Sequence, residues 1–188
     1  MKWKIIAIAA PSGSGKTTIA NRLLSLFQNL SFSISATTRT PRNNEIDGIN
    51  YHFLTVDDFK QGISENKFLE WEMVYEGKYY GTLQSEIGRI WENNKIPLLD
   101  MDVKGALHLR DQYPKQTLTI FIDPPSSQEL ENRLRNRGTE TEESLKMRMG
   151  KSVYEMTFRN SFDHIILNDD LDIAVAETQA AIHEFLNS

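Results

Sequence analysis

The sequence predicts an α/β fold, in which helices flank a parallel sheet core that carries a small mixed α/β insertion and a helical flap. Short apolar runs alternate with stretches of helical period, which is typical of βαβ units. Residues 35–83 break this rhythm with shorter strand-like pieces rich in Thr, Arg, Asn, Tyr and Gly. Residues 124–158 break it again, because they open with two prolines and continue as two charged helical stretches. We therefore expect the core to comprise residues 1–34, 84–123 and 159–188.

The first two elements are an apolar strand and a helix. Residues 4–10 are almost entirely Ile and Ala, which indicates a strand buried on both faces. Two lysines before this run resemble the start of a signal peptide, but the run is too short for one and leads directly into a glycine-rich loop. Residues 16–27 follow with helical period. The side expected to be buried carries Ile19, Leu23, Leu26 and Phe27.

The remaining elements follow from the same patterns. Further core strands are expected at residues 96–101, 118–122 and 164–167, and helices at 103–113, 127–138 and 171–186. Ser126 and Glu129 have the spacing of a capping box at the start of the second of these helices. The insertion should contain strands at 51–54 and 68–75 around a helix at 56–65. No repeat or low-complexity linker is present, so we expect subdomains of one unit.

Composition excludes several classes of function. The net charge of −5 disfavours a general nucleic-acid binder. The absence of cysteine excludes disulfides, thiolate metal sites and a cysteine nucleophile. The four histidines lack the spacing of metal ligands. No stretch reaches the length of a membrane span. We expect a cytoplasmic protein that binds neither nucleic acid nor membrane.

A phosphate-binding loop lies between the first strand and helix, with the sequence Ala10-Pro-Ser-Gly-Ser-Gly-Lys-Thr17. Small residues let successive backbone N–H groups turn inward around an anion, and the helix N-terminus adds its dipole. Lys16 can supply a charge to the β- and γ-phosphates, and the Thr17 hydroxyl can reach Mg²⁺. Ala10 replaces the usual first glycine. The residues expected to bind ATP here are Ser12, Gly13, Ser14, Gly15, Lys16, Thr17 and Thr18.

Asp100 ends an apolar strand, Pro97-Leu-Leu-Asp100. In a parallel sheet this position faces the phosphate-binding loop, where a carboxylate can hold Mg²⁺ through water. The alternative is a solvated carboxylate or a helix cap. We favour the magnesium role, which makes Thr17 and Asp100 the expected metal residues.

The loop alone does not identify an acceptor, but later segments do. These include Ser35-Ala-Thr-Thr-Arg39-Thr-Pro-Arg42, Phe68-Leu-Glu-Trp71, Tyr80-Gly-Thr82, Leu98-Leu-Asp-Met-Asp-Val-Lys-Gly105, Arg133-Leu-Arg-Asn-Arg-Gly-Thr139 and Asn168-Asp-Asp170. In this order they resemble the guanylate kinase family from end to end. One departure is the stretch 74–77, about one residue longer than the common spacing, which we expect to alter only a turn.

The resemblance implies that Arg39, Arg42, Tyr51 and Tyr80 bind the phosphate of GMP. Two guanidinium forks and two neutral phenolic donors suit a dianion. Without the resemblance, a solvated basic patch is the usual interpretation of two loop arginines. Glu45 lies close enough in sequence to orient them.

The resemblance also places Glu70 and Asp102 at the guanine base, with Ser35 and Thr82 adding hydroxyl groups. Carboxylates accept hydrogen bonds from guanine N1 and N2, whereas adenine has no such donors on that edge. Such a site can discriminate by roughly 10⁴. The alternatives are a surface strand residue for Glu70 and a helix N-cap for Asp102.

The flap, by resemblance, is a lid that delivers arginines to the transferring phosphoryl group. Arg137 and Arg148 are expected at the γ-phosphate, Arg133 nearer the adenosine, and Asn168 at the adenine. The alternative is a set of surface arginines paired with Glu140, Glu142 and Glu143. No general base is needed, because the nucleophile is an ionised phosphate oxygen of GMP. The expected catalytic residues are Lys16, Arg39, Arg137 and Arg148.

The resemblance therefore implies a Mg²⁺-dependent kinase that transfers a phosphoryl group directly from ATP to GMP, and also to dGMP, as a monomer or homodimer. Residues 35–83 would be the GMP-binding subdomain and residues 124–158 the lid. Two alternatives stay open at this point. One is a non-catalytic binding module of scaffold proteins, although these typically have a degraded phosphate-binding loop. The other is a related kinase with a different small-molecule acceptor.

Overall fold

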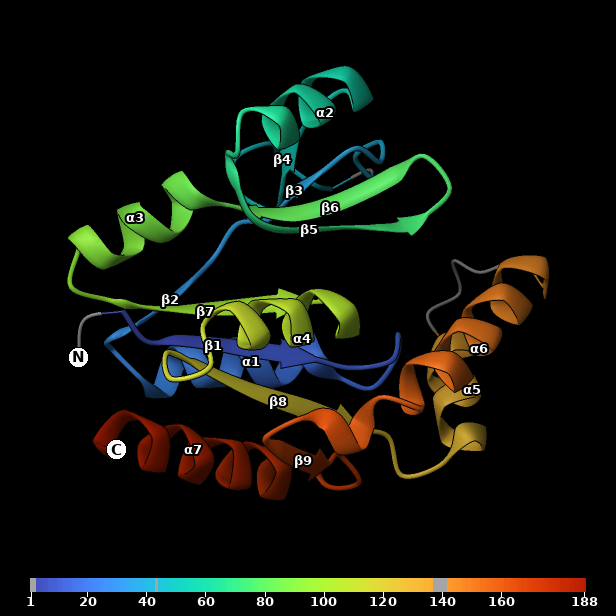
Figure 1. The fold of residues 1–188 in the computed structure, drawn as a ribbon. Coiled ribbons are helices and arrows are strands. Elements are labelled where there is room, and N and C mark those ends of the chain that lie inside the picture. Colours follow the sequence, from blue (N-terminus) through green and yellow to red (C-terminus); the bar gives the residue numbers. More distant parts are fainter. Residues whose placement is uncertain (1–2, 43, 137–141) are drawn as a thin grey trace.

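The computed structural model describes residues 3–42, 44–136 and 142–188. Within these residues the main sheet has five parallel strands in the order β2-β7-β1-β8-β9 (Figure 1). The strands are β1 (Ile5–Ala9), β2 (Leu30–Phe32), β7 (Ile96–Met101), β8 (Thr117–Asp123) and β9 (His164–Leu167). The predicted parallel core is confirmed, and β1 at its centre leads directly into the phosphate-binding loop.

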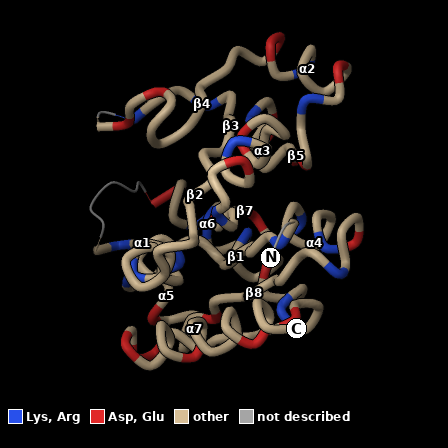
Figure 2. Tube along the Cα trace, turned by 90° about the vertical axis from the view of Figure 1, so that its left-hand side faces the viewer, with Lys and Arg blue, Asp and Glu red and all other residues tan. Residues whose placement is uncertain are grey.

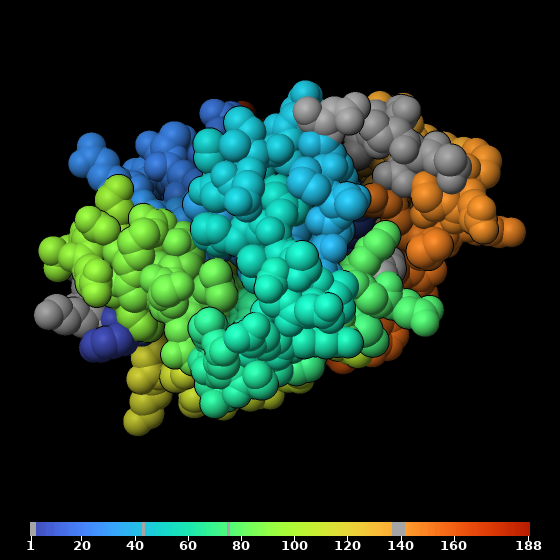
Figure 3. Space-filling model, turned by 90° about the horizontal axis from the view of Figure 1, so that it is seen from above, coloured from blue at the N-terminus to red at the C-terminus, as the bar shows by residue number. Residues whose placement is uncertain are grey.

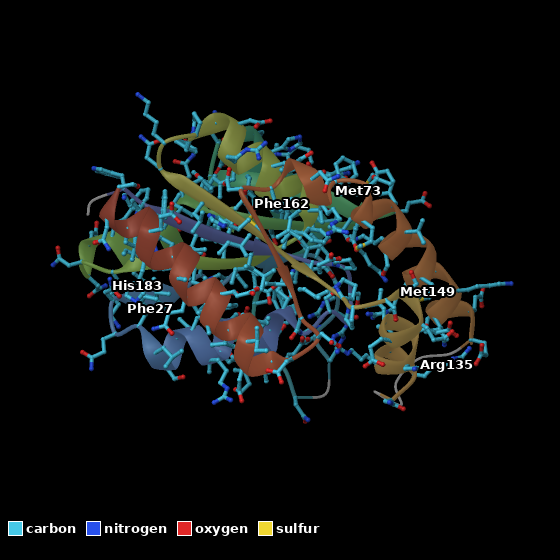
Figure 4. All side chains as sticks on the ribbon, turned by 90° about the horizontal axis from the view of Figure 1, so that it is seen from below. Phe27, Met73, Arg135, Met149, Phe162 and His183 are labelled. Atoms are coloured by element: carbon cyan, nitrogen blue, oxygen red, sulfur yellow. The ribbon has the colours of Figure 1, made fainter. Side chains whose placement is uncertain are left out.

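Helices cover both faces of this sheet. Because strand side chains alternate between faces, Ile6 and Ile8 of β1 pack with α1 (Lys16–Leu26) and α7 (Leu171–Asn187). Ile5 and Ala7 pack on the opposite face, against α3 (Gln84–Glu92) and α4 (Val103–Gln112). Figure 4 shows Phe27 beside His183 where α1 meets α7, and their ring centroids are 4.8 Å apart.

A second, mixed sheet stands over the main one. Its strands are β3 (Ala36–Thr37), β4 (His52–Phe53), β5 (Phe68–Tyr75) and β6 (Lys78–Leu83), in the order β4-β3-β6-β5. Helix α2 (Val56–Ser64) covers it, and the rings of Phe59 and Phe68 stack with centroids 4.2 Å apart. Figure 1 shows this layer over the carboxyl-terminal half of the main sheet, and Figure 3 shows its outer surface from above.

A helical pair stands beyond the carboxyl ends of the main strands (Figure 1). It consists of α5 (Ser127–Asn136) and α6 (Glu142–Met156), followed by a 3-10 helix at Arg159–Ser161. The expected capping box is half formed, because the Ser126 hydroxyl accepts from Glu129 N at 3.1 Å while the Glu129 carboxylate pairs with Arg133. An ion pair of 3.0 Å between Asp123 and Arg159 joins the two ends of the segment.

One prediction of local structure was wrong, and several elements were not predicted. Leu26, expected inside, is 51% exposed, because α1 ends there and Ala20 occupies the buried stripe instead. The sequence patterns missed β2, β3, β6 and α3. For β2 and β3 the reason is their length, since strands of two or three residues have too few positions to show a period. The extra residue near Val74 produces an irregular register between Met73 and Tyr75 of the β5–β6 hairpin.

The surface carries charges of both signs. Figure 2 shows basic and acidic positions interspersed over the trace rather than gathered by sign on separate faces. Across the described parts of the chain, no helix combines the length and the hydropathy needed to cross a bilayer.

Candidate functional site

A cleft of about 270 Å³ lies where the phosphate-binding loop, the second sheet and α6 meet. The predicted site residues that line the cleft are Ser12, Gly13, Ser14, Gly15, Lys16, Thr17, Thr18, Ser35, Arg42, Tyr51, Glu70, Tyr80, Asp100, Asp102 and Arg148. Residues from five separate segments therefore meet in one place.

The phosphate-binding loop makes the floor of the cleft. Gly13 and Gly15 have φ of +99° and +86°, a region that only glycine adopts readily. Ala10, in place of the usual first glycine, is buried in the core. The Lys16 ammonium contacts Asp100 Oδ1 at 2.7 Å and donates to the Met101 carbonyl at 2.6 Å. Burial acts to lower the pKa of Lys16, but the Asp100 carboxylate outweighs it, so the pKa lies above its ordinary value.

Thr17 and Asp100 provide hard oxygen ligands beside this lysine. The Thr17 hydroxyl donates to Asp100 Oδ2 at 3.1 Å. In the residues that the structure describes, no three His, Asp or Glu side chains group as a metal site. The carboxylate of Asp100 and the hydroxyl of Thr17 are oxygen donors of the kind that Mg²⁺ takes together with water and phosphate oxygens.

The loop after β3 contributes Arg42 and Tyr51 to the cleft, and β6 contributes a second phenol, Tyr80. Arg42, Tyr51 and Tyr80 line the cleft, but Arg39 turns toward Glu45. The guanidinium of Arg39 makes two hydrogen bonds to the Glu45 carboxylate, of 2.5 and 2.6 Å, and lies 4.8 Å from the Tyr51 ring centroid. The Glu45 carboxylate also accepts from Arg42 N at 2.8 Å. The Arg39–Glu45 pair thus ties together the loop that carries Arg42.

This pairing changes the titration of both partners. Hydrogen bonds from Arg39 lower the pKa of Glu45 from 4.5 to about 2. The same bonds raise the pKa of Arg39. The pair is therefore fully ionised at neutral pH, and the expectation that Glu45 orients the arginines agrees with this geometry.

Two carboxylates converge on the side wall of the cleft. A Cβ added to Gly105 would lie 2.7 Å from Glu70 Oε2 and 2.8 Å from Asp102 Oδ1. The buried Thr82 hydroxyl donates to Glu70 Oε1 at 2.7 Å, so it fixes the Glu70 side chain. Asp102 is also the N-cap of α4, since its Oδ1 accepts from Gly105 N at 2.8 Å. The two interpretations of Asp102 are compatible, because the residue both caps α4 and lines the cleft.

Burial raises the pKa of Glu70 from 4.5 to about 7, and the nearby Asp102 charge acts in the same direction. The hydrogen bond from Thr82 opposes this shift only in part. Strongly shifted carboxyl groups in a cleft are typical of functional sites.

Of the arginines that the structure describes in the helical pair, Arg148 lines the cleft. Arg148 of α6 donates to the Ser12 hydroxyl at 2.8 Å. Arg133 of α5 instead pairs with Glu129 at 2.9 Å and donates to the Asn168 carbonyl at 3.3 Å. Arg137 lies outside the described residues. Of the acidic partners considered for these arginines, Glu142 pairs with Arg135.

Asn168 occupies an unexpected position. Its side chain is buried and donates to the carbonyl of Ser14 at 2.6 Å, beneath the phosphate-binding loop. The loop after β9 thus touches the back of the phosphate-binding loop.

Lys151 and Glu155 also line the cleft, and the sequence patterns missed them. They lie three and seven residues after Arg148 on α6, so all three share one face of the helix. Lys151 and Glu155 form an ion pair of 3.3 Å, and burial raises the pKa of Glu155. The helical spacing from Arg148 was the signal that could have identified them.

Comparison with known proteins gives a consistent result. The family model described as guanylate kinase matches residues 2–185. The chain is 48% identical to the guanylate kinase of Bacteroides thetaiotaomicron, over all of this chain and 92% of that protein. It is 46% identical to the guanylate kinase of Salinibacter ruber, over 98% of this chain and 97% of that one.

A solved structure extends the similarity to three dimensions. The crystal structure of guanylate kinase from Anaplasma phagocytophilum matches with a TM-score of 0.78 and 25% sequence identity. The match covers 97% of this chain and 86% of that chain.

Proposed function

The chain belongs to the guanylate kinase family and phosphorylates GMP with ATP, and from that premise we propose how its cleft performs the transfer. The γ-phosphoryl group passes directly to GMP. The bond from the γ-phosphorus to the β–γ bridging oxygen breaks as a GMP phosphate oxygen bonds to that phosphorus, and ADP leaves with the bridging oxygen. No side chain carries the phosphoryl group in between.

The donor end of the cleft is the phosphate-binding loop. Backbone N–H groups of residues 12–18 surround the triphosphate, and Lys16 neutralises charge on its β- and γ-phosphates. A kinase that uses ATP generally needs a divalent metal ion, and we propose Mg²⁺ held by Thr17 and Asp100. When bound, Mg²⁺ neutralises phosphate charge. The 3.1 Å contact between the Thr17 hydroxyl and Asp100 supports this pairing of ligands.

The acceptor end lies in residues 35–83, which we propose as the GMP-binding subdomain. Arg42, Tyr51 and Tyr80 bind the GMP phosphate, and Arg39 joins them on the side away from Glu45. Glu70 and Asp102 accept the N1 and N2 protons of guanine, with Ser35 and Thr82 alongside. Because every assigned contact is to phosphate or base, dGMP is a second acceptor.

Residues 124–158 are proposed as a lid over the transferring group. Arg148 donates to Ser12 in the phosphate-binding loop, which supports its assignment to the charge that develops on the equatorial oxygens. Arg133 lies on the adenosine side, and Arg137 is assigned to the γ-phosphate on the resemblance alone. Closure excludes water, which would otherwise compete with GMP for the phosphoryl group.

No general base takes part in this mechanism. The attacking oxygen of GMP is ionised at neutral pH, so catalysis consists of alignment, charge neutralisation and exclusion of water. The observation that carries the proposal is that Lys16, Arg148 and Arg42 line the same cleft.

The Arg39–Glu45 pair provides a test of the acceptor end. In the variant Glu45→Gln, Arg39 loses an ionised partner and the loop around Arg42 loosens. We expect KM for GMP to rise about tenfold while KM for ATP stays within twofold. Steady-state kinetics with each substrate varied in turn measures both values.

Glu65→Gln is the matched control, because Glu65 forms an exposed ion pair with Lys67 in the same insertion. This variant should leave both KM values unchanged. A folded Glu45→Gln protein whose KM for GMP equals that of wild type would exclude the pair from the acceptor site.

A further inference from the structure

Asn168 links the loop after β9 to the phosphate-binding loop. Only 5% of the residue is exposed. Its backbone N–H donates to the Asp123 carbonyl at 2.8 Å, which fixes it at the end of β8. Its side-chain Nδ2 donates to the Ser14 carbonyl at 2.6 Å, across 154 positions of sequence. A buried hydrogen bond between two anchored segments constrains both of them.

The Ser14 carbonyl and the Gly15 N–H belong to one peptide unit. That unit is planar and trans, so its C=O and N–H point in opposite directions. When Asn168 holds the carbonyl on the buried side, the Gly15 N–H is directed to the other side. Gly15 lines the cleft, so that side is where the phosphates of ATP are proposed to bind.

The contact also explains why residue 15 is glycine. Its φ of +86° disfavours other residues, and a Cβ placed there would lie 2.3 Å from Asn168 Nδ2. That distance is far inside van der Waals contact, so the Asn168 amide occupies the space a side chain would need. The two residues therefore fit together as a unit.

We propose that Asn168 is a positioning residue for the reaction, whose amide fixes the Ser14–Gly15 peptide so that the phosphate-binding loop presents its N–H groups to the triphosphate. This inference rests on the proposed assignment of that loop to ATP. It differs from the expectation that Asn168 contacts adenine, and the two roles make different predictions. An adenine contact affects only ligands that carry the base, whereas a positioned loop affects any polyphosphate.

Inorganic tripolyphosphate, used with Mg²⁺ as a competitive inhibitor against ATP, separates the two roles. In Asn168→Ala we expect KM for ATP and the inhibition constant of tripolyphosphate to rise by the same factor, about tenfold, because a misaligned N–H weakens a charge-assisted hydrogen bond. The KM for GMP should stay within twofold. Asn168→Leu keeps the side-chain shape without the donor and should give the same result.

Asn93→Ala is the matched control, because Asn93 also donates its amide to a carbonyl, that of Arg89 at 2.8 Å, far along the chain from the loop. It should change neither constant. A rise in KM for ATP with no change for tripolyphosphate in a folded variant would overturn the proposal in favour of an adenine contact. Unchanged constants for both ligands, with only a lower Tm, would reduce Asn168 to a structural role.

The same assays on the wild-type protein test the assignment of the phosphate-binding loop to ATP separately from the role of Asn168. Competitive inhibition of the wild type by tripolyphosphate establishes that the donor end binds polyphosphate. If the wild type is not inhibited, the assignment of the loop itself fails, and the proposal for Asn168 fails with it.

Discussion

Lys16→Ala is expected to lower kcat for GMP phosphorylation by roughly 10³. The ammonium group is the charge on the floor of the cleft that we assign to the β- and γ-phosphates, and it stays protonated because Asp100 raises its pKa. No other lysine of the described phosphate-binding loop can replace it. A coupled assay of ADP release at saturating ATP and GMP measures the loss.

Lys67→Ala controls for the removal of a lysine, because Lys67 is exposed and pairs with Glu65 on the surface of the insertion. It should keep wild-type activity. Since Lys16→Ala also leaves Asp100 without its 2.7 Å partner, circular dichroism must show that the variant is folded. A folded Lys16→Ala enzyme that keeps more than about a tenth of wild-type kcat would contradict the assignment of this residue.

Glu70→Gln is expected to reduce the preference for GMP over AMP by roughly 10² in kcat/KM. The substituted amide has almost the same shape, but it can place N–H donors opposite the N–H donors of guanine. The loss should therefore fall on GMP and not on ATP. Initial rates with GMP, dGMP, AMP and UMP as acceptors measure the change in preference.

Glu72→Gln is the matched control, because Glu72 lies two positions along β5 and pairs with His108 at 2.8 Å. It should discriminate among acceptors as the wild type does. If Glu70→Gln also discriminates as sharply as the wild type, guanine recognition lies elsewhere.

The raised pKa of Glu70 adds a pH dependence to the same prediction. A carboxyl group with a pKa of about 7 is ionised above that pH, so KM for GMP should rise as the pH falls from 8 to 6. GMP phosphate also gains a proton in this range, near pH 6. The Glu70→Gln variant keeps the pH dependence that comes from the GMP phosphate. The part of the pH dependence of KM for GMP that is lost in the variant therefore comes from Glu70.

The free energy of unfolding should also depend on pH. Ionisation of Glu70 improves binding of GMP as the pH rises, but it lowers the stability of the folded protein. Between pH 4.5 and about 7 the folded protein holds a proton on Glu70 that the unfolded chain releases. The contribution of this group is therefore fully present below pH 4.5 and is lost as the pH rises through 7. Burial of Glu70 therefore lowers the free energy of unfolding once the carboxyl group is ionised, although it supplies a carboxylate for recognition of the base.

Much of the site was predictable because its signals are local. The strand, glycine-rich loop and helix around Lys16 are contiguous in sequence, and each has a pattern that backbone geometry dictates. Asp100 followed from its place at the end of an apolar strand, since parallel strands bring their carboxyl ends together. The resemblance then supplied Glu70 and Asp102, whose convergence on Gly105 agrees with a shared wall.

The other features depend on contacts that no local pattern encodes. Arg39 was predicted at the acceptor phosphate with Glu45 close by, but the two hydrogen bonds that join them depend on how the loop folds. Asn168 was predicted at the adenine, and its side-chain amide donates to a carbonyl 154 positions away, a contact that the sequence does not indicate. Hydrogen bonds of this kind depend on tertiary packing. The sequence therefore indicates which residues belong to the site, but not which atoms their side chains contact.

The stereochemistry of transfer is the most direct test of the claim that the two ends of the cleft exchange a phosphoryl group in one step. ATP made chiral at the γ-phosphorus with oxygen isotopes would be supplied with GMP, and the configuration at the β-phosphorus of the GDP product determined. A single in-line displacement predicts inversion. Retention would mean that a group on the enzyme carries the phosphoryl in between, which would contradict the account.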